Sequence, residues 1–282
     1  MSTLEIPDDL LREITGKTIV ITGGSSGIGK ATADLCIKLG ALVVIGDITP
    51  PPNFEATKRY KFLKVDVSIW ESIRGFFAQA KDLFGRIDHV FVNAGVAPTT
   101  DFLNHTLDSD GNIAPPNLRT INVNLIGAIN TVWLATYYLQ NDTRESSPAE
   151  RSIVLTASAS SFQNFRAADY TTAKHGVLGI LRGLVGKLEG KVRINAIAPS
   201  WTATGLIPPE PFEALGVAVQ NPKVVARSVV FLFASGTRHG DLIYSRDGIY
   251  LEINRATGGL LENTERLLGG VMNEDEVYRR IS

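Results

Sequence analysis

Tyr170 and Lys174 are the residues whose types and spacing point most directly to chemistry. They lie four positions apart in a stretch with helical periodicity, so both side chains are expected on one face of a helix. A free tyrosine has a pKa of about 10 and is a poor base at neutral pH. A neighbouring ammonium group favours the phenolate, which makes Tyr170 a candidate general acid/base. Alone the pair is weak evidence, because the same spacing is common on helix surfaces.

A glycine-rich loop lies upstream of this pair, Thr22-Gly23-Gly24-Ser25-Ser26-Gly27-Ile28-Gly29. It follows a short apolar run and opens a helical stretch, which is the context that a phosphate-binding loop requires. Gly23 permits the tight turn, Gly27 lets the backbone approach a pyrophosphate, and Gly29 lets the helix pack on the strand. The helix N-terminus adds free N–H groups and partial positive charge. The loop therefore predicts a dinucleotide site; the alternative is a turn that is glycine-rich for backbone reasons only.

Asp47 ends the next apolar run, about twenty residues beyond the loop. A carboxylate there can accept hydrogen bonds from both adenosine ribose hydroxyls and would repel a 2′-phosphate. No Lys or Arg lies in the loop before Lys30 or directly after Asp47 to neutralise such a phosphate. We therefore expect NAD as the cofactor, in preference to NADP. The alternative is an Asp that caps the turn into Ile48-Thr49-Pro50 and leaves the cofactor open.

Apolar runs alternate with amphipathic stretches along the chain. Strands are expected over 17–22, 41–47, 60–67, 87–93, 152–157 and 192–197, with one or two more within 241–253. Helices are expected over 27–39, 68–83, 117–139, 167–188 and 222–235. Pro50-Pro51-Pro52 makes the second crossover short or irregular. The pattern predicts an α/β fold, a single doubly wound Rossmann-type domain with a parallel seven-stranded sheet, helices on both faces and ligands at the carboxyl ends of the strands.

Composition narrows the class of protein. The 282 residues suit one α/β domain, and the net charge of −1 with scattered Lys and Arg argues against a nucleic-acid or anionic-membrane partner. No run approaches the roughly 18 apolar residues of a membrane span, and the N-terminus lacks a secretory signal pattern. The four histidines lack metal-ligand spacing, so no metal site is expected. The single cysteine, Cys36, excludes an intramolecular disulfide and favours a cytoplasmic protein.

Several motifs, taken together, have the order and spacing of a known family. They are the loop Thr22–Gly29, Asn93-Ala94-Gly95, Asn124, Ser158, Tyr170 and Lys174. In this set the chain resembles the short-chain dehydrogenase/reductase family from about residue 16 to 252. The resemblance implies an NAD-dependent oxidoreductase that interconverts a secondary alcohol and a ketone, with oxidation as the working direction.

The resemblance also implies a role for each polar residue of the set. Tyr170 would exchange a proton with the substrate oxygen, and Lys174 would bind the nicotinamide ribose and lower the pKa of the phenol. Ser158 would hydrogen-bond and orient the substrate oxygen. Asn124 would hold a water that links Lys174 to solvent. The remaining cofactor contacts would come from Gly23, Ser25, Ser26, Gly27, Ile28 and Gly29 at the phosphates and ribose, Asp66 and Val67 at adenine, Asn93, Ala94 and Gly95 beneath the cofactor, and Pro199 and Thr204 at nicotinamide.

Two of these assignments have neighbouring alternatives. Ser160 and Ser161 compete with Ser158, which we favour because it ends the strand twelve residues before Tyr170. Asn122 competes with Asn124, and either could instead cap or bend a helix.

The sequence departs from the family pattern near its C-terminal end. Ser200 stands where the family usually has Gly after Pro199, and Ser245–Tyr250 lacks the usual Asp-Gly-Gly. We place a substrate lid at about 200–219 and a peripheral tail at about 255–282 of this single-domain chain.

Apolar residues indicate the substrate. Trp201, Leu206, Ile207 and Phe212 would give the lid an apolar inner face, and Phe162 and Phe165 would line the same cavity. We expect a bulky apolar alcohol or ketone of a terpenoid, steroid-like or polyketide type, as in secondary metabolism; the alternative is that these aromatics are core. The apolar helix over 117–139 suggests a homo-oligomer, a dimer or tetramer. A second hypothesis keeps the nucleotide but makes the chain an isomerase, a cyclase or a redox-sensing binding protein.

Overall fold

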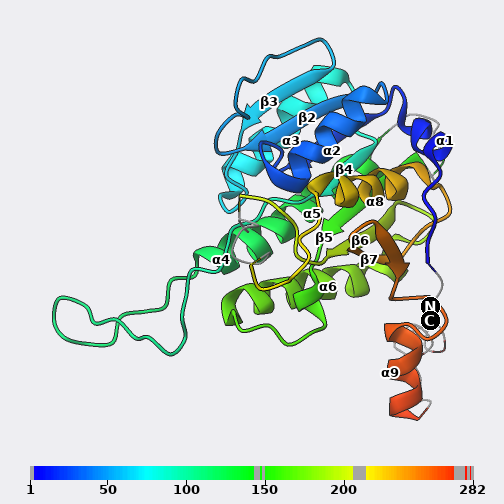
Figure 1. The fold of residues 1–282 in the computed structure, drawn as a ribbon. Coiled ribbons are helices and arrows are strands. Elements are labelled where there is room, and N and C mark those ends of the chain that lie inside the picture. The colour runs from blue at the N-terminus through cyan, green and yellow to red at the C-terminus, as the bar shows by residue number, and fades with distance from the viewer. Residues whose placement is uncertain are drawn as a thin grey trace.

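A twisted eight-stranded sheet forms the centre of the computed structural model, which describes residues 3–142, 147, 150–205, 214–269, 277 and 280 (Figure 1). The strand order is β3-β2-β1-β4-β5-β6-β7-β8. The strands are β1 (Thr18–Thr22), β2 (Leu42–Asp47), β3 (Tyr60–Lys64), β4 (His89–Val92), β5 (Ser152–Thr156), β6 (Arg193–Pro199), β7 (Leu242–Arg246) and β8 (Ile249–Glu252). The order reverses between β1 and β4, where ligands of doubly wound sheets bind.

The predicted parallel sheet is confirmed except for its strand count. Strands β1 to β7 pair in parallel, and β8 adds an eighth strand that runs antiparallel to β7. The turn between β7 and β8 explains the difference. Asp247 and Gly248 both have positive φ, 49° and 83°, and an Asp-Gly pair of this kind closes a tight two-residue hairpin.

Helices cover both faces of the sheet, because residues of each central strand point alternately to the two sides. Ile19 and Ile21 of β1 pack in one apolar layer, whereas Val20 packs in the other. The first layer is covered by α1 (Asp8–Leu11), η1 (Arg12–Ile14), α2 (Gly27–Lys38) and α8 (Pro222–Ala234). The second is covered by α3 (Trp70–Phe84), α5 (Gly127–Gln140) and α6 (Ala168–Leu188). None of the helices within the described ranges is both long and apolar enough to cross a bilayer.

Three segments bear on the details of the sequence prediction, and two of them differ from it. The helix expected over 117–139 is divided into α4 (Arg119–Ile121), a π-helical turn η2 (Asn122–Ile126) and α5. The crossover from β2 to β3 contains no helix, as the three prolines predicted. A further helix, α9 (Leu260–Leu268), forms in the tail; it has no buried residue and stands away from the sheet in Figure 1.

A long excursion follows β4 and leaves the body of the molecule before the chain returns at α4 (Figure 1). We call residues 101–118 the arm. An isolated bridge pairs Leu107 with Ile113 across it, and both side chains are exposed. The arm begins at the carboxyl edge of the sheet, a few residues after the candidate site residues Asn93, Ala94 and Gly95.

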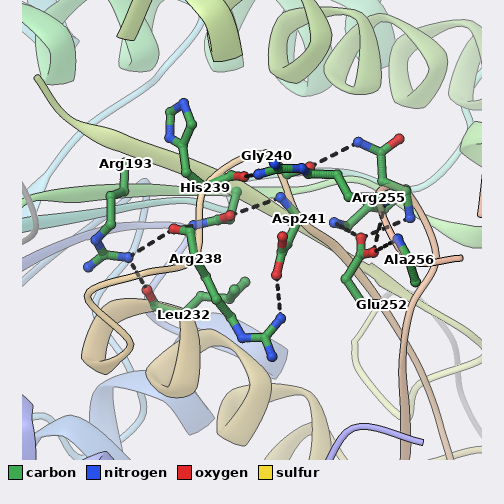
Figure 2. Close-up of polar contacts among 12 residues, drawn as sticks. Arg193, Leu232, Arg238, His239, Gly240, Asp241, Glu252, Arg255 and Ala256 are labelled. Atoms are coloured by element: carbon green, nitrogen blue, oxygen red, sulfur yellow. Dashed lines mark hydrogen bonds and ion pairs between the residues drawn. The ribbon is translucent and has the colours of Figure 1, made fainter. Parts of the chain in front are cut away.

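At the end of the sheet opposite to the carboxyl edge, a polar network connects β6, β7 and β8 with one another and with α8 (Figure 2). Arg193 donates to the carbonyl oxygens of Leu232 and Phe233, both at 2.8 Å, at the end of α8. Glu252 accepts hydrogen bonds from the backbone N–H groups of Leu242 and Ala256. These contacts lie away from the carboxyl edge, so their role is to fix the last strands.

His89 is buried at the start of β4 and faces α8. Its Nδ1 lies 2.9 Å from the Ser152 hydroxyl oxygen, and its ring stacks on Phe233 at a centroid distance of 5.0 Å. Burial, with the positive charge of Arg193, lowers the pKa of His89 to about 3. The folded protein therefore holds a neutral imidazole at this position.

We expect this imidazole to make the protein less stable below neutral pH. The unfolded chain binds the His89 proton at a pKa of about 6.5, so the free energy of unfolding should fall by about 1.4 kcal/mol per pH unit as pH drops from 6.5 towards 3. Urea denaturation at several pH values would measure the slope. His89→Gln should flatten it above pH 4.5, whereas His175→Gln, on the exposed face of α6, should not. An equal slope in wild type and His89→Gln would contradict the assignment.

Candidate active site

Several positions of the loop between β1 and α2 have room only for glycine. Gly23 has a φ of +68°, and a Cβ there would lie 2.7 Å from the Cα of Ala94. At Gly29 a Cβ would lie 2.0 Å from the carbonyl oxygen of Gly23. Gly27 also has a positive φ, and a Cβ on it would reach 3.0 Å from Cγ2 of Thr204. The loop therefore packs tightly against β4, while its outer side faces the segment after β6.

Asp47 lies beside this loop. One carboxylate oxygen accepts from the N–H of Ser25 at 3.1 Å, and the other accepts from the N–H of Ile48 at 2.8 Å. The Ser25 hydroxyl donates to the carbonyl of Thr49, and Ser26 has extended backbone just before α2. Ile28 packs half-buried on the apolar layer of α2. The contact with Ile48 is the turn cap that the sequence offered as an alternative to ribose binding. The contact with Ser25 places the same carboxylate beside the glycine loop.

Asp66 and Val67 follow β3. Asp66 accepts from both the N–H and the hydroxyl of Ser68, at 2.9 and 2.6 Å, so its carboxylate caps a local turn. Val67 is buried, and Gly127 of α5 packs so closely on it that a Cβ there would lie 2.5 Å from a Val67 methyl. Both residues lie at the carboxyl edge of the sheet. Their contacts with Ser68 and Gly127 are made within the chain.

Asn93 joins the ends of three strands. Its Nδ2 donates to the carbonyl oxygens of Thr22 and Gly23, at 3.2 and 3.0 Å. Its Oδ1 accepts from the Thr156 hydroxyl of β5 at 3.2 Å. Ala94 and Gly95 continue the segment, half-buried, and lie under the glycine loop and near Asn124, respectively. Asn93 therefore holds the floor of the site together through its amide.

Ser158, Tyr170 and Lys174 come together beyond β5. Ser158 caps the short helix η4 (Ala159–Ser161), and its hydroxyl hydrogen-bonds the phenol of Tyr170. The Nζ of Lys174 lies 5.7 Å from the centroid of the Tyr170 ring and donates to the carbonyl of Thr156 at 2.7 Å. Of the two competing serines, Ser161 donates instead to the carbonyl of Lys174. Of these three serines, Ser158 is the one whose hydrogen bond lowers the pKa of Tyr170.

Burial shifts the pKa values of both Tyr170 and Lys174. Burial raises the pKa of Tyr170, and the hydrogen bond from Ser158 lowers it only in part. Burial also lowers the pKa of Lys174 to about 8. Burial is the largest cause of the pKa shift at both groups, and the lowering of the phenol pKa by Lys174 that the family resemblance implies stays a prediction.

Asn124 is buried in the π-helical turn η2, whereas the competing Asn122 is exposed. The Asn124 side chain accepts from the N–H of Val96 at 2.7 Å and donates to its carbonyl at 3.0 Å. The amide therefore clamps the segment after β4. Single π-helical turns interrupt the regular backbone ladder and often occur at functional sites.

Pro199 ends β6 and leads into the segment that carries Thr204. A residue missed by the sequence analysis, Gln220, fixes this segment; its buried amide donates to the hydroxyl of Thr202 and the carbonyl of Ser245, at 3.1 and 3.0 Å. A lone Gln carries no local signal that could have identified it. The remaining lid residues Leu206, Ile207 and Phe212 lie outside the described residues.

The aromatic residues divide into two groups. The ring of Phe165 lies 6.1 Å from that of Tyr170 and 5.6 Å from that of Trp201, and it is 38% exposed. Phe162 instead packs on the core and on Tyr244, which is the alternative considered for these residues. Phe165 and Trp201 thus form an apolar wall beside the phenol.

Asp169, the residue before Tyr170, was also missed. It is buried, and its carboxylate accepts from the N–H groups of Thr99 and Thr100, at 2.8 and 3.1 Å. These donors lie about 70 positions away, so only the position of an Asp in the first turn of α6 could have drawn attention to it.

Comparison with known proteins agrees with this architecture. The sequence matches the short chain dehydrogenase family over residues 17–210. The short-chain dehydrogenase/reductase ascJ of Acremonium egyptiacum is 43% identical over 288 residues, covering 100% of this chain and 96% of that protein. The 5'-hydroxyaverantin dehydrogenase of Dothistroma septosporum is 30% identical, covering 77% of each. The NADPH-dependent 3-quinuclidinone reductase from Rhodotorula rubra, 20% identical, shares the fold with a TM-score of 0.69 over 88% of this chain and 97% of that one.

The match spans the glycine loop, the ends of the central strands and the helix of Tyr170. The chain therefore belongs to the short-chain dehydrogenase/reductase family and is an oxidoreductase of that family.

Proposed function

We propose that this enzyme interconverts a secondary alcohol and a ketone with NAD, and that Tyr170 is its general acid/base. The observation that carries the proposal is the contact of the Tyr170 phenol with the Ser158 hydroxyl, with the Lys174 ammonium 5.7 Å from the ring. A binding protein has no need of a half-buried hydroxyl and phenol held together beside a buried ammonium group.

The residues around the glycine loop fit a dinucleotide. A Cβ at Gly29 would overlap the Gly23 carbonyl, so the loop keeps its backbone open at the N-terminus of α2, where a pyrophosphate is favoured. Ser25, Ser26 and Asp47 lie along the same edge and would meet the ribose and phosphates. When bound, the nicotinamide would supply the hydride acceptor for oxidation or the donor for reduction.

In the direction of oxidation, the protein positions the substrate and removes a proton. Ser158 donates a hydrogen bond that orients the alcohol oxygen, and Tyr170 takes the hydroxyl proton as the carbonyl forms. The positive charge of Lys174 stabilises the phenolate. Reduction uses the same groups in reverse, with Tyr170 donating the proton.

Asp47 supports a preference for NAD. Its carboxylate lies within hydrogen-bond distance of the loop N–H of Ser25, so negative charge is fixed where the adenosine ribose would lie. A 2′-phosphate would be repelled there. One carboxylate oxygen of Asp47 caps the turn at Ile48, and this hydrogen bond fixes the orientation of the side chain. The contact with the ribose is our inference.

We further propose a bulky apolar substrate of a terpenoid, steroid-like or polyketide type. The half-exposed ring of Phe165, backed by Trp201, offers a flat apolar surface beside Tyr170. The relative from Dothistroma septosporum, named for 5'-hydroxyaverantin, is consistent with an alcohol larger than a simple metabolite.

We also propose that the enzyme is a homo-oligomer, a dimer or a tetramer. An apolar stripe of Ile126, Ile129, Trp133 and Tyr137 is exposed around α5, with Trp133 at 69%. A groove of about 470 Å³ lies between this stripe and α6, where Gly183 leaves room for close approach. Such a face suits association with a second copy.

Replacing the general acid/base should separate chemistry from binding. Tyr170→Phe should lower kcat by about 100- to 10,000-fold, because proton transfer is lost, while NAD binding measured by calorimetry stays close to wild type. Tyr137→Phe, on the exposed face of α5, is the matched control. Activity that survives in Tyr170→Phe with NAD still bound would favour the isomerase, cyclase or redox-sensor alternative.

The cofactor preference can be tested at Asp47. Asp47→Ala should lower the ratio of kcat/KM with NAD to kcat/KM with NADP by about 10- to 100-fold, since charge-assisted hydrogen bonds and the repulsion of a 2′-phosphate are both lost. Asp34→Ala removes a carboxylate from the exposed face of α2 and should leave the ratio unchanged. A wild-type enzyme that prefers NADP would refute the proposal directly.

The apolar wall predicts how turnover depends on substrate size. Phe165→Ala should lower kcat/KM for a fused-ring alcohol such as 1-tetralol by about 10-fold or more, and for 2-propanol by much less, because apolar contact area is lost. Phe102→Ala, in the exposed arm, should change neither. Wild-type turnover confined to small polar alcohols would rule out the substrate class.

A further inference from the structure

Asp169 joins two segments that meet beside the proposed catalytic tyrosine. It is the second residue of α6 and is only 2% exposed. One carboxylate oxygen accepts from the N–H groups of Thr99 and Thr100, at 2.8 and 3.1 Å. The other accepts from the N–H of Tyr170 itself, at 2.7 Å. A single side chain thus binds the root of the arm and the backbone of Tyr170.

The segment that it holds is fixed by neighbouring contacts as well. Thr120 of α4 lies 2.9 Å, hydroxyl to hydroxyl, from Thr99 and donates to the carbonyl of Ala97 at 3.2 Å. The same hydroxyl also contributes to lowering the pKa of Asp169. Asn124 clamps Val96 through both atoms of its amide. Residues 96–100 are therefore attached to α4, to η2 and, through Asp169, to the first turn of α6.

Only a carboxylate satisfies this arrangement. All three backbone groups that face Asp169 are donors, and between them they bind both carboxylate oxygens. An Asn has the same shape but a single acceptor oxygen, so its NH₂ group would face a donor on one side. Burial raises the pKa of Asp169, but the hydrogen bonds from Thr99, Thr120, Tyr170 and Thr100 bring it below its ordinary value. The group is therefore ionised at neutral pH.

We infer that Asp169 is a positioning residue: its carboxylate ties the root of the arm to the backbone of Tyr170 and thereby sets the phenol against Ser158. The inference rests on the proposed function of Tyr170 as general acid/base. Its consequence is specific, because the Ser158 hydrogen bond is the contact that lowers the pKa of the phenol. If Asp169 holds that contact in place, its loss should raise the pKa of Tyr170.

The test compares Asp169→Asn with Asp88→Asn. Asp88 is an equally buried carboxylate at the opposite end of the sheet, where it accepts from the N–H of Thr18 and pairs with Arg86. Both variants place an amide where buried donors need a carboxylate, so both should lose stability. Only Asp169→Asn should change the tyrosine.

The readout is the titration of Tyr170 by NMR in protein labelled with [¹³Cζ]tyrosine, with the resonance assigned by its absence in Tyr170→Phe. In Asp169→Asn the pKa of Tyr170 should rise by about one unit or more. Where turnover is measurable, kcat should fall by about 10-fold or more, because small displacements of a reacting group are costly. Asp88→Asn should match wild type in both measurements.

Three results would overturn the inference or the proposed function, and they can be told apart. A fall in the Tyr170 pKa in Asp169→Asn would mean that the carboxylate acts by its charge, and an unchanged pKa would mean that it is structural only. Either outcome refutes positioning. Absence of any NAD-dependent turnover in wild type would refute the oxidoreductase proposal, while the titration still decides the role of Asp169.

Thr120→Val is a second, milder variant in case Asp169→Asn does not fold. It removes the hydroxyl that lies against Thr99 and lowers the pKa of Asp169, with little change in shape. A smaller upward shift of the Tyr170 pKa would support the inference, and no shift in this variant would count against it.

Discussion

The amide of Asn93 is the contact on which the site depends most, because it closes the carboxyl ends of three parallel strands. It donates to the end of β1 and to Gly23, and it accepts from Thr156 of β5. The same strand end carries Ala94, which packs under Gly23 so closely that no side chain fits there. The glycine loop, the floor of the site and the strand that leads to Ser158 are therefore held in one relative position. Each element then needs only local interactions to present its own groups.

Local patterns were enough to predict the parallel strands and the layers of helices. Apolar runs of strand length and the alternating burial of β1 follow from periods of two and 3.6 residues that a sequence displays directly. The proximity of Tyr170 and Lys174 was expected from helical spacing, whereas that of Ser158 was expected from a family resemblance. The sequence predicts one or two strands within 241–253, which leaves the eighth strand open, and its Asp-Gly turn lies in a segment that departs from the family pattern.

Contacts between distant segments could not be predicted. Asp169 meets donors about 70 positions away, and Gln220 meets a carbonyl 25 positions away, so neither has a local signature. The effect of burial on the pKa of Tyr170 could not be predicted for a related reason. Spacing shows that a cation lies near, but it does not show how far both groups are removed from water, and desolvation is the larger effect here. The clamp between Asn124, in the π-helical turn, and Val96 is likewise a contact between segments distant in the sequence.

The arm also divides the chain in a way that bears on its assembly. Strands β1 to β4 precede it and form one half of the sheet, while β5 to β8 follow it and form the other. The halves meet along a single line of strand pairing, between β4 and β5. The arm is thus an exposed seam between two contiguous half-sheets, and a cut or an inserted sequence there would leave every strand pairing within each half untouched. Fragments on either side of it are natural partners for complementation.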